Sequence, residues 1–402
     1  MFEQNPERAS QRPVEGRRNV LKSSAFLLGA SLLSRNALGS SGPHPANPSQ
    51  GDSQMKSQNP TAINQRMMGY MLAHEQFTVP QLVDIGVAAE AAGFDVLATS
   101  DHLQPWQSNE AHAGEAWVTF GALSQRTKRS WMGTTVTCPT FRYNPAVVAE
   151  AFVSMSLLAP GRIFLGVGSG EALNEQAATG QWPNWQERSE RLIEATELIR
   201  QLWKGEQVVH KGKYYNVNAK LYDTAPQPIP LLMAANGPKA MRRAGQYADG
   251  LITDPNTWKK HKAEFEAGAK AAGKDPSTMP ILVEQFVVVG DESDAKSTAE
   301  LWRFIPEAFT KYYNVRDPKT IQQRAEAELP LKKVYGDWPV STDPQVHIKA
   351  VNDLFASGAT IVNIHCARAD QKKVVEFYGK QVIPGVKRNL TAWDLTSQKR
   401  SA

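Results

Sequence analysis

From residue 67 onward, short apolar segments alternate with segments whose apolar residues recur at helical spacing. Leu82, Ile85, Gly86 and Ala89, for example, fall on one face of a helix. Strands that alternate with helices pair in parallel, and eight such units in roughly 320 residues predict a single closed (β/α)8 barrel of the TIM type. The expected strands are Met67–Leu72, Asp95–Ser100, Trp131–Thr137, Ile163–Gly168, Ile229–Ala235, Gly250–Thr253, Ile281–Val289 and Thr360–Cys366.

An open, doubly wound sheet is the alternative architecture for the same alternation. A GxGxxG motif after the first strand would favour it, but Met67–Leu72 leads into Ala-His-Glu-Gln-Phe. Two segments are longer than ordinary βα loops. Residues 206–218 have the pattern of a β-hairpin that turns at Lys211-Gly212, and residues 291–345 should hold one or two extra helices. Long insertions usually serve a binding site or its lid.

The first 66 residues differ in character from the rest of the chain. Paired arginines at 17–18, a short apolar segment at 25–33 and small residues at 37–39 are typical of a twin-arginine signal peptide over residues 1–39. An amphipathic surface helix is the alternative. Residues 40–66 are rich in Ser, Pro, Asn and Gln, which predicts a disordered linker before the barrel at 67–392 and a tail at 393–402. The twin-arginine translocase is then an expected partner, and the periplasm or cell envelope, with or without membrane association, is the expected location.

The formal net charge of +5 is concentrated at the N-terminus, because residues 1–66 contain eight Lys or Arg and four Asp or Glu. The barrel is therefore near neutral, and its charge gives no argument for a nucleic-acid partner. Cys138 and Cys366 are too few for a disulfide framework or a cysteine metal site, and no metal is expected. Each lies in an apolar segment, where a small buried side chain is the expected role.

Polar and aromatic residues follow the predicted strands directly, and a barrel of this type forms its active site at the carboxyl ends of its strands. His102, beside Asp101, is a residue type that exchanges protons near neutral pH, although a lone histidine is often structural. Trp106 is expected either to form an aromatic wall for a planar ligand or only to pack against neighbouring side chains. Glu171 follows a Gly-Ser-Gly turn that is expected to begin a helix. The helix N-terminus would keep its carboxylate ionised for the site, or Glu171 would simply cap the helix.

A second turn, Asn236-Gly237-Pro238-Lys239, leads into another expected helix with Pro238 at its first position. Free backbone N–H groups at such a helix start bind anions, and Lys239 adds a cation. Together with the acid, imidazole and indole groups, this turn predicts hydride chemistry on a planar cofactor that bears a phosphate.

The motifs SDHLQPW (100–106), PTFRYNPAV (139–147), FLGVGSGEALNE (164–175) and ADGLIT (248–253) resemble the F420-dependent branch of the bacterial luciferase-like superfamily. The resemblance extends from about residue 67 to 390. It implies a TIM barrel that binds the deazaflavin coenzyme F420, with His102 as the proton-abstracting base, Trp106 as the aromatic stabiliser and Glu171 as the acid beside the deazaflavin. It also implies a bulge behind the deazaflavin ring at 135–137. The implied cofactor-binding positions are Asp101, Cys138, Ser169, Gly170, Asn174, Asn236, Gly237, Lys239 and Ala240, with Cys138 and Asn236 departing from the family's Thr and Gly.

The substrate positions depart further from the family. Relatives that act on sugar phosphates hold the phosphate with Thr, two Lys and an Arg, and the matching positions here are Asp254, Thr257, Arg324 and Asp337. Carboxylates repel a phosphate dianion, so phosphate binding should be lost. The twin-arginine signal points instead to an exported member of the family that acts on an envelope lipid. The expected reaction is oxidation of a secondary hydroxyl, from hydroxymycolic acid to ketomycolic acid.

Two other functions stay open at this stage. One is an FMN-dependent luciferase-like monooxygenase on the same barrel, and the other is an exported protein that binds F420 or lipid without catalysis. Binding alone requires no base, so His102, Trp106 and Glu171 together favour an enzyme. The aromatic residues of Leu301–Phe309 either form an apolar mouth with the 206–218 hairpin or are ordinary core of an amphipathic helix. The sequence leaves open whether the protein is a monomer or a homodimer.

Overall fold

Eight parallel strands close a barrel in the residues that the computed structural model describes, which are 63, 65–110 and 112–388. The strand order around the barrel is β1-β10-β9-β8-β7-β4-β3-β2. The predicted barrel is therefore confirmed, and the open doubly wound sheet is wrong. The bounds of these strands are β1 Met67–Leu72, β2 Val96–Thr99, β3 Trp131–Thr134, β4 Ile163–Val167, β7 Leu231–Ala234, β8 Gly250–Thr253, β9 Ile281–Phe286 and β10 Ile361–His365.

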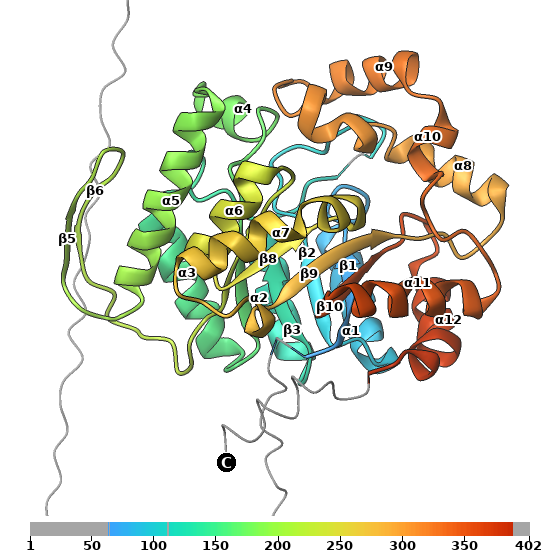
Figure 1. The fold of residues 1–402 in the computed structure, drawn as a ribbon, viewed down its shortest axis with the longest axis horizontal. Coiled ribbons are helices and arrows are strands. Elements are labelled where there is room, and N and C mark those ends of the chain that lie inside the picture. Colours follow the sequence, from blue (N-terminus) through green and yellow to red (C-terminus); the bar gives the residue numbers. More distant parts are fainter. Residues whose placement is uncertain (1–62, 64, 111, 389–402) are drawn as a thin grey trace, which may run out of the picture. The chain divides into compact units, whose positions relative to one another are not determined.

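Helices surround the barrel on its outside (Figure 1). Several begin at a proline behind a polar cap; α3, for example, begins at Pro145 with the Asn144 side chain accepting from the N–H of Ala146. Among the described helices, none has the length and apolar character needed to cross a membrane. The bounds are α1 Val79–Ala92, α2 Ala116–Arg126, α3 Pro145–Leu158, α4 Glu175–Thr179, α5 Trp185–Leu202, α6 Pro238–Tyr247, α7 Pro255–Ala271, α8 Glu292–Leu301, α9 Pro318–Glu328, α10 Leu331–Tyr335, α11 Pro344–Ser357 and α12 Gln371–Phe377.

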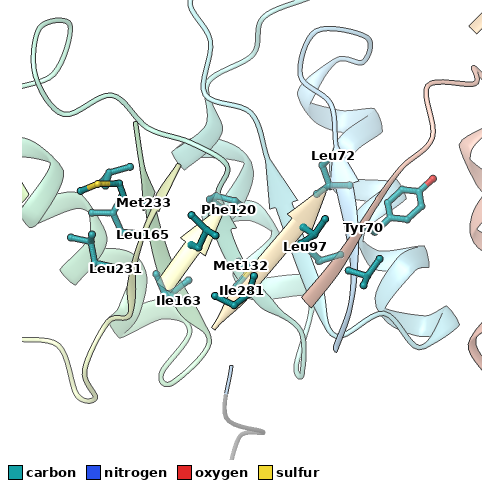
Figure 2. Close-up of a cluster of buried hydrophobic side chains, with 14 of the residues drawn as sticks. Tyr70, Leu72, Leu97, Phe120, Met132, Ile163, Leu165, Leu231, Met233 and Ile281 are labelled. Atoms are coloured by element: carbon teal, nitrogen blue, oxygen red, sulfur yellow. The ribbon is translucent and has the colours of Figure 1, made fainter. Parts of the chain in front are cut away.

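The apolar core has two layers because successive strand residues point to opposite faces. Outward residues such as Tyr70 and Leu165 pack against the helices (Figure 2). The predicted face of α1 belongs to this layer, since Leu82 and Ala89 are fully buried there. Inward residues such as Phe164 form a smaller cluster inside the barrel. The helices and strands therefore hold the loops at the carboxyl ends of the strands on a rigid frame.

Both insertions contain the expected kinds of element. The hairpin consists of β5 (Val208–Lys211) and β6 (Asn216–Ala219) in antiparallel register, and it lies along α5. His210 and Lys213 of the hairpin bond to Glu194 and Glu190 of α5 at 3.0 and 2.8 Å. The second insertion exceeds the prediction of one or two helices, because α8, α9 and α10 all fall within the described part of it. These three helices lie with α4 at the top of Figure 1, at the carboxyl end of the barrel.

A cavity of about 530 Å³ opens at the opposite end of the barrel. Its lining includes Arg66, Met279 and Thr360, which precede β1, β9 and β10. The cavity is therefore remote from the loops that carry the predicted site. The expected signal peptide at 1–39, most of the linker and the tail at 393–402 lie outside the described residues.

Candidate active site

His102 lies in the loop after β2 and faces a buried carboxylate from the loop after β1. Its Nδ1 is 3.7 Å from Oε1 of Glu75, whose residue is only 2% exposed. The hydroxyl of Ser100 donates to Oε2 of Glu75 at 2.7 Å and fixes the carboxylate. Because Glu75 lies beside Nδ1, the Nε2 atom of His102 is the nitrogen left for a substrate. Sequence reasoning gave Glu75 no role although it closely follows the first predicted strand, because the sequence does not show which side chains of the two loops meet.

Trp106 lies on the same loop and is buried in an aromatic group. The centroid of its ring is 6.0 Å from that of His102, and the ring stacks on Phe304 with the centroids 4.7 Å apart. Phe309 contacts Trp106 edge to face at 6.1 Å and is 53% exposed. Trp302 and Phe304 are buried core, but they follow the end of α8 at Leu301 and do not lie on an amphipathic α-helix. Phe309 offers an exposed apolar surface, and the mouth expected between this segment and the 206–218 hairpin is not confirmed, because the hairpin lies along α5.

Asn174 joins the loop of His102 to the loop of Glu171. Its Oδ1 accepts from the N–H groups of Leu103 and Gln104 at 2.9 and 3.2 Å, and its Nδ2 donates to Oε2 of Glu171 at 3.3 Å. One side chain thus connects the backbone that follows His102 to the carboxylate of Glu171. The expectation that the turn at 168–170 opens a helix at Glu171 is wrong, because α4 begins four residues later, at Glu175. Glu171 lies in a turn, where its carbonyl accepts from the N–H of Glu175.

Asp101 is the centre of a buried ion-pair network. Its Oδ1 accepts from Arg142 at 2.8 Å and from the Tyr143 hydroxyl at 3.2 Å, and its Oδ2 accepts from Thr137 at 2.6 Å. Arg142 also donates to the Asp101 carbonyl at 2.9 Å. These bonds tie the loops after β2 and β3 together. The cofactor contact expected for Asp101 stays a prediction. In the structure, both of its carboxylate oxygens accept hydrogen bonds from protein groups.

Glu175 is a second carboxylate of this network that sequence reasoning missed. Its Oε2 accepts from the backbone N–H of Arg142 at 2.8 Å, and its Oε1 is 3.8 Å from Nε of Arg142. Burial raises the pKa of Glu175 to about 7 and outweighs the opposing bonds from Arg142. Glu175 therefore carries a proton for part of the time near neutral pH.

The predicted cofactor positions after β3 and β4 lie close together. Gly170 has φ of +75°, and a Cβ there would lie 2.7 Å from Sγ of Cys138, so only glycine fits this turn. Cys138 is buried, as expected, with its Sγ 3.1 Å from the Thr140 hydroxyl. Ser169 precedes Gly170 in the same turn and is half-buried.

The predicted bulge at 135–137 interrupts the barrel directly after β3. The Thr135–Val136 peptide bond is cis, and Thr137 returns to bridge Val167. Val136 packs on the inner cluster but stays partly exposed. A Cβ at Gly168 would lie 2.5 Å from the Val136 side chain, so glycine allows this close approach. The bulge therefore presents an apolar surface at the carboxyl end of the barrel.

The turn after β7 leads into α6 as predicted, with Pro238 as the first helical residue and Gly237 as its cap. No side chain caps this helix start, and nothing lies within 4 Å of a Cβ built at Gly237. Asn236 and Lys239 are exposed, and Ala240 is half-buried. Open space, uncapped N–H groups and a lysine fit an anionic group here.

The structure brings three of the four predicted substrate positions together. Oδ1 of Asp254 accepts from the N–H groups of Asn256 and Thr257 at 2.9 and 3.0 Å. The Asn256 side chain donates to Oδ2 of Asp337 at 3.3 Å. Arg324 is exposed on α9, and no recorded hydrogen bond or ion pair within the described residues joins it to the other three. Asp254 is thus also a helix cap, which is a second reason for a carboxylate at that position.

The barrel, with its interrupted third strand and this loop arrangement, belongs to a known family. A family model described as luciferase-like monooxygenase matches residues 62–358, which is well over half of the chain. The chain therefore belongs to the luciferase-like family, as its motifs predicted.

Two curated relatives and one solved structure are particularly similar to the chain. The F420-dependent hydroxymycolic acid dehydrogenase of Mycobacterium tuberculosis is 46% identical over 79% of this chain and 88% of its own. The F420-dependent glucose-6-phosphate dehydrogenase of Microbacterium testaceum is 39% identical over 80% and 97%. An F420-dependent secondary alcohol dehydrogenase, solved with an F420–acetone adduct, superimposes with a TM-score of 0.76 at 32% identity, over 80% of this chain and 99% of its own.

Proposed function

We propose that this protein is an exported F420-dependent dehydrogenase that oxidises a secondary hydroxyl of an envelope lipid, from hydroxymycolic acid to ketomycolic acid. The observation that carries the proposal is the arrangement of His102, Glu75 and Trp106 at the carboxyl end of the barrel. The 46% identity to a hydroxymycolic acid dehydrogenase and the likeness to a secondary alcohol dehydrogenase support the same chemistry.

The residues present fit F420. The uncapped start of α6, with Gly237 and Lys239, suits the phosphodiester of the cofactor. The partly exposed Val136 offers an apolar surface for the planar ring, and Ser169 and Gly170 lie in the neighbouring turn. When bound, F420 would supply the hydride acceptor for oxidation of the carbinol carbon.

The protein supplies the proton chemistry. His102 takes the hydroxyl proton at Nε2, while the charge of the Glu75 carboxylate, 3.7 Å from Nδ1, stabilises the imidazolium that results. Trp106, held in place by its stack on Phe304, lies beside the imidazolium. Glu171, fixed by Asn174, is the acid we assign to the cofactor side of the site.

Two carboxylates and an exposed aromatic ring around the proposed substrate site favour a lipid substrate over a sugar phosphate. Asp254 and Asp337 lie at the two ends of one Asn256 bridge. Each carboxylate at about 6 Å would repel a phosphate dianion by several kcal/mol at an effective dielectric near 20. The exposed Phe309 beside Trp106 provides contact area for an alkyl chain.

Export is the remaining part of the proposal. The paired arginines at 17–18 and the apolar segment that follows support transport by the twin-arginine translocase. That route carries folded proteins, so the cofactor could travel inside its enzyme to an envelope substrate. Immunoblots of fractionated cells test this part, and a protein confined to the cytoplasm would contradict it.

The substrate assignment is tested by assaying F420 reduction in parallel with hydroxymycolic acid and with glucose-6-phosphate. We expect turnover with the lipid and none with millimolar glucose-6-phosphate, because the mouth carries carboxylates where a phosphate site needs cations. A glucose-6-phosphate dehydrogenase from the same family serves as the positive control for the assay. Measurable glucose-6-phosphate oxidation by this protein would contradict the lipid assignment.

A further inference from the structure

A His–Glu pair inside the barrel has no part in the function proposed above. His365 ends β10 opposite Phe286, and Glu284 of β9 lies opposite Asn363. Leu282 of β9 belongs to the inner cluster, and side chains alternate along a strand, so Glu284 and Phe286 also point inward. The pair therefore lies in the barrel near the carboxyl ends of β9 and β10, at the end that carries the active site.

The pairing leaves one nitrogen of His365 free. Nδ1 of His365 is 2.8 Å from Oε1 of Glu284, so the carboxylate holds a proton on Nδ1 and directs Nε2 away from itself. Nε2 is buried and has no hydrogen-bond partner among the described residues. The His365 side chain is 1% exposed, whereas that of Glu284 is 22% exposed, so the buried ring lies beside a partly exposed carboxylate.

Trp302 provides a second unpartnered atom next to His365. The two rings meet edge to face with centroids 4.5 Å apart, and Nε1 of Trp302 is also buried without a hydrogen-bond partner in the described part of the chain. The indole N–H is a donor, and Nε2 of a histidine protonated at Nδ1 is an acceptor. A hydroxyl group can accept from the first and donate to the second. A carboxylate would face the charge of Glu284, and a carbonyl could satisfy only the donor.

A series of neighbouring aromatic rings runs from Trp302, which lies beside His365, to His102. Successive ring centroids are 5.8 Å apart from Trp302 to Phe304, 4.7 Å from Phe304 to Trp106 and 6.0 Å from Trp106 to His102. The two histidines thus lie at the ends of one apolar row. The other face of His365 stacks on Phe286 at 4.0 Å, which in turn stacks on Trp338, the neighbour of Asp337. Two stacked contacts therefore link His365 to Trp338, which is adjacent in sequence to the predicted substrate position Asp337.

We infer that His365 and Trp302, with Glu284 orienting the imidazole, form a second hydroxyl-binding subsite. The substrate would then carry two hydroxyl groups separated by an apolar stretch, one oxidised at His102 and one bound at His365. This inference rests on the proposed function, because it assigns the first hydroxyl to His102.

Direct binding to the full-length protein tests the subsite without F420. The probes are straight-chain alkanols with a secondary hydroxyl and the diols of the same length, titrated by calorimetry over a series of spacings. We expect the diol with the matching spacing to bind about tenfold more tightly than its mono-alcohol, as one added hydrogen bond would provide. A wild-type protein without preference for any diol would overturn the inference.

Two variants separate hydrogen bonding from packing. His365→Phe keeps a ring of similar shape, and Trp302→Phe removes the indole N–H, so either should abolish the diol preference while mono-alcohol affinity stays within about twofold. If one variant fails to fold, the other decides. A diol preference that survives in the folded variants, or an equal loss of affinity for both alcohols, would contradict the subsite. Failure of the proposed function gives a different result, namely no F420 reduction with any alcohol despite intact diol preference.

Discussion

Replacement of His102 by Ala should lower kcat by about 10²- to 10⁴-fold and leave F420 affinity unchanged. The imidazole is the group placed to take the hydroxyl proton, since Glu75 occupies the side of Nδ1 and leaves Nε2 for the substrate. The measurement is the steady-state rate of F420 reduction, together with a fluorescence titration of F420 into the same variant.

His210→Ala is the matched control for this change. His210 also pairs with a glutamate, Glu194, at 3.0 Å, but it lies on the hairpin that packs along α5. We expect wild-type kcat for the control. If His102→Ala keeps wild-type turnover, or loses F420 binding to the same extent as activity, the assignment of His102 as the base is wrong.

Replacement of Arg142 by Met should lower the free energy of unfolding by about 3 to 5 kcal/mol, because it strands a buried carboxylate. Arg142 donates to Asp101 at 2.8 Å, and the Asp101 side chain is only 1% exposed. Arg126→Met is the control, since Arg126 pairs with Asp84 at the same distance with both side chains more than half exposed. It should cost less than about 1 kcal/mol. Equal losses for the two variants in urea unfolding would contradict a supporting role for the Asp101–Arg142 pair.

Glu175→Gln should raise the free energy of unfolding, and the size of the gain should depend on pH. The pKa of Glu175 is raised to about 7 in the folded protein, so its ionisation costs stability as pH rises from about 4.5 to 7. The glutamine variant should therefore gain up to about 3 kcal/mol over the wild type at pH 8 and little at pH 4.5. A difference that does not change with pH would show that burial does not control this carboxyl.

The repeating pattern of the chain predicted the barrel well because each strand is a short apolar segment between helices. Met67–Leu72 and Gly250–Thr253 match β1 and β8 in full, while Trp131–Thr137 extends beyond β3 because the bulge at 135–136 leaves the ladder. His102 and Trp106 were found because both directly follow a strand. The three-helix insertion was underestimated, since short helices such as α10 (Leu331–Tyr335) leave little periodic signal.

The missed site residues depend on contacts between loops that are distant in sequence. Glu75 and Glu175 look like ordinary surface acids in the sequence, and only the closed barrel brings them to His102 and Arg142. Their position directly after a strand, or close behind one, was an available signal. The pairing of Glu284 with His365 had a similar signal, because an acid within an otherwise apolar strand must find a partner.

The choice of cofactor is the most direct test of the account. Purified protein should be titrated separately with F420 and with FMN, and its fluorescence and absorbance recorded before and after addition of hydroxymycolic acid. We predict that F420 binds in preference to FMN and that its absorbance bleaches when the lipid is added. Preferential binding of FMN, with no bleaching of F420 by the lipid, would contradict the account and favour the monooxygenase alternative.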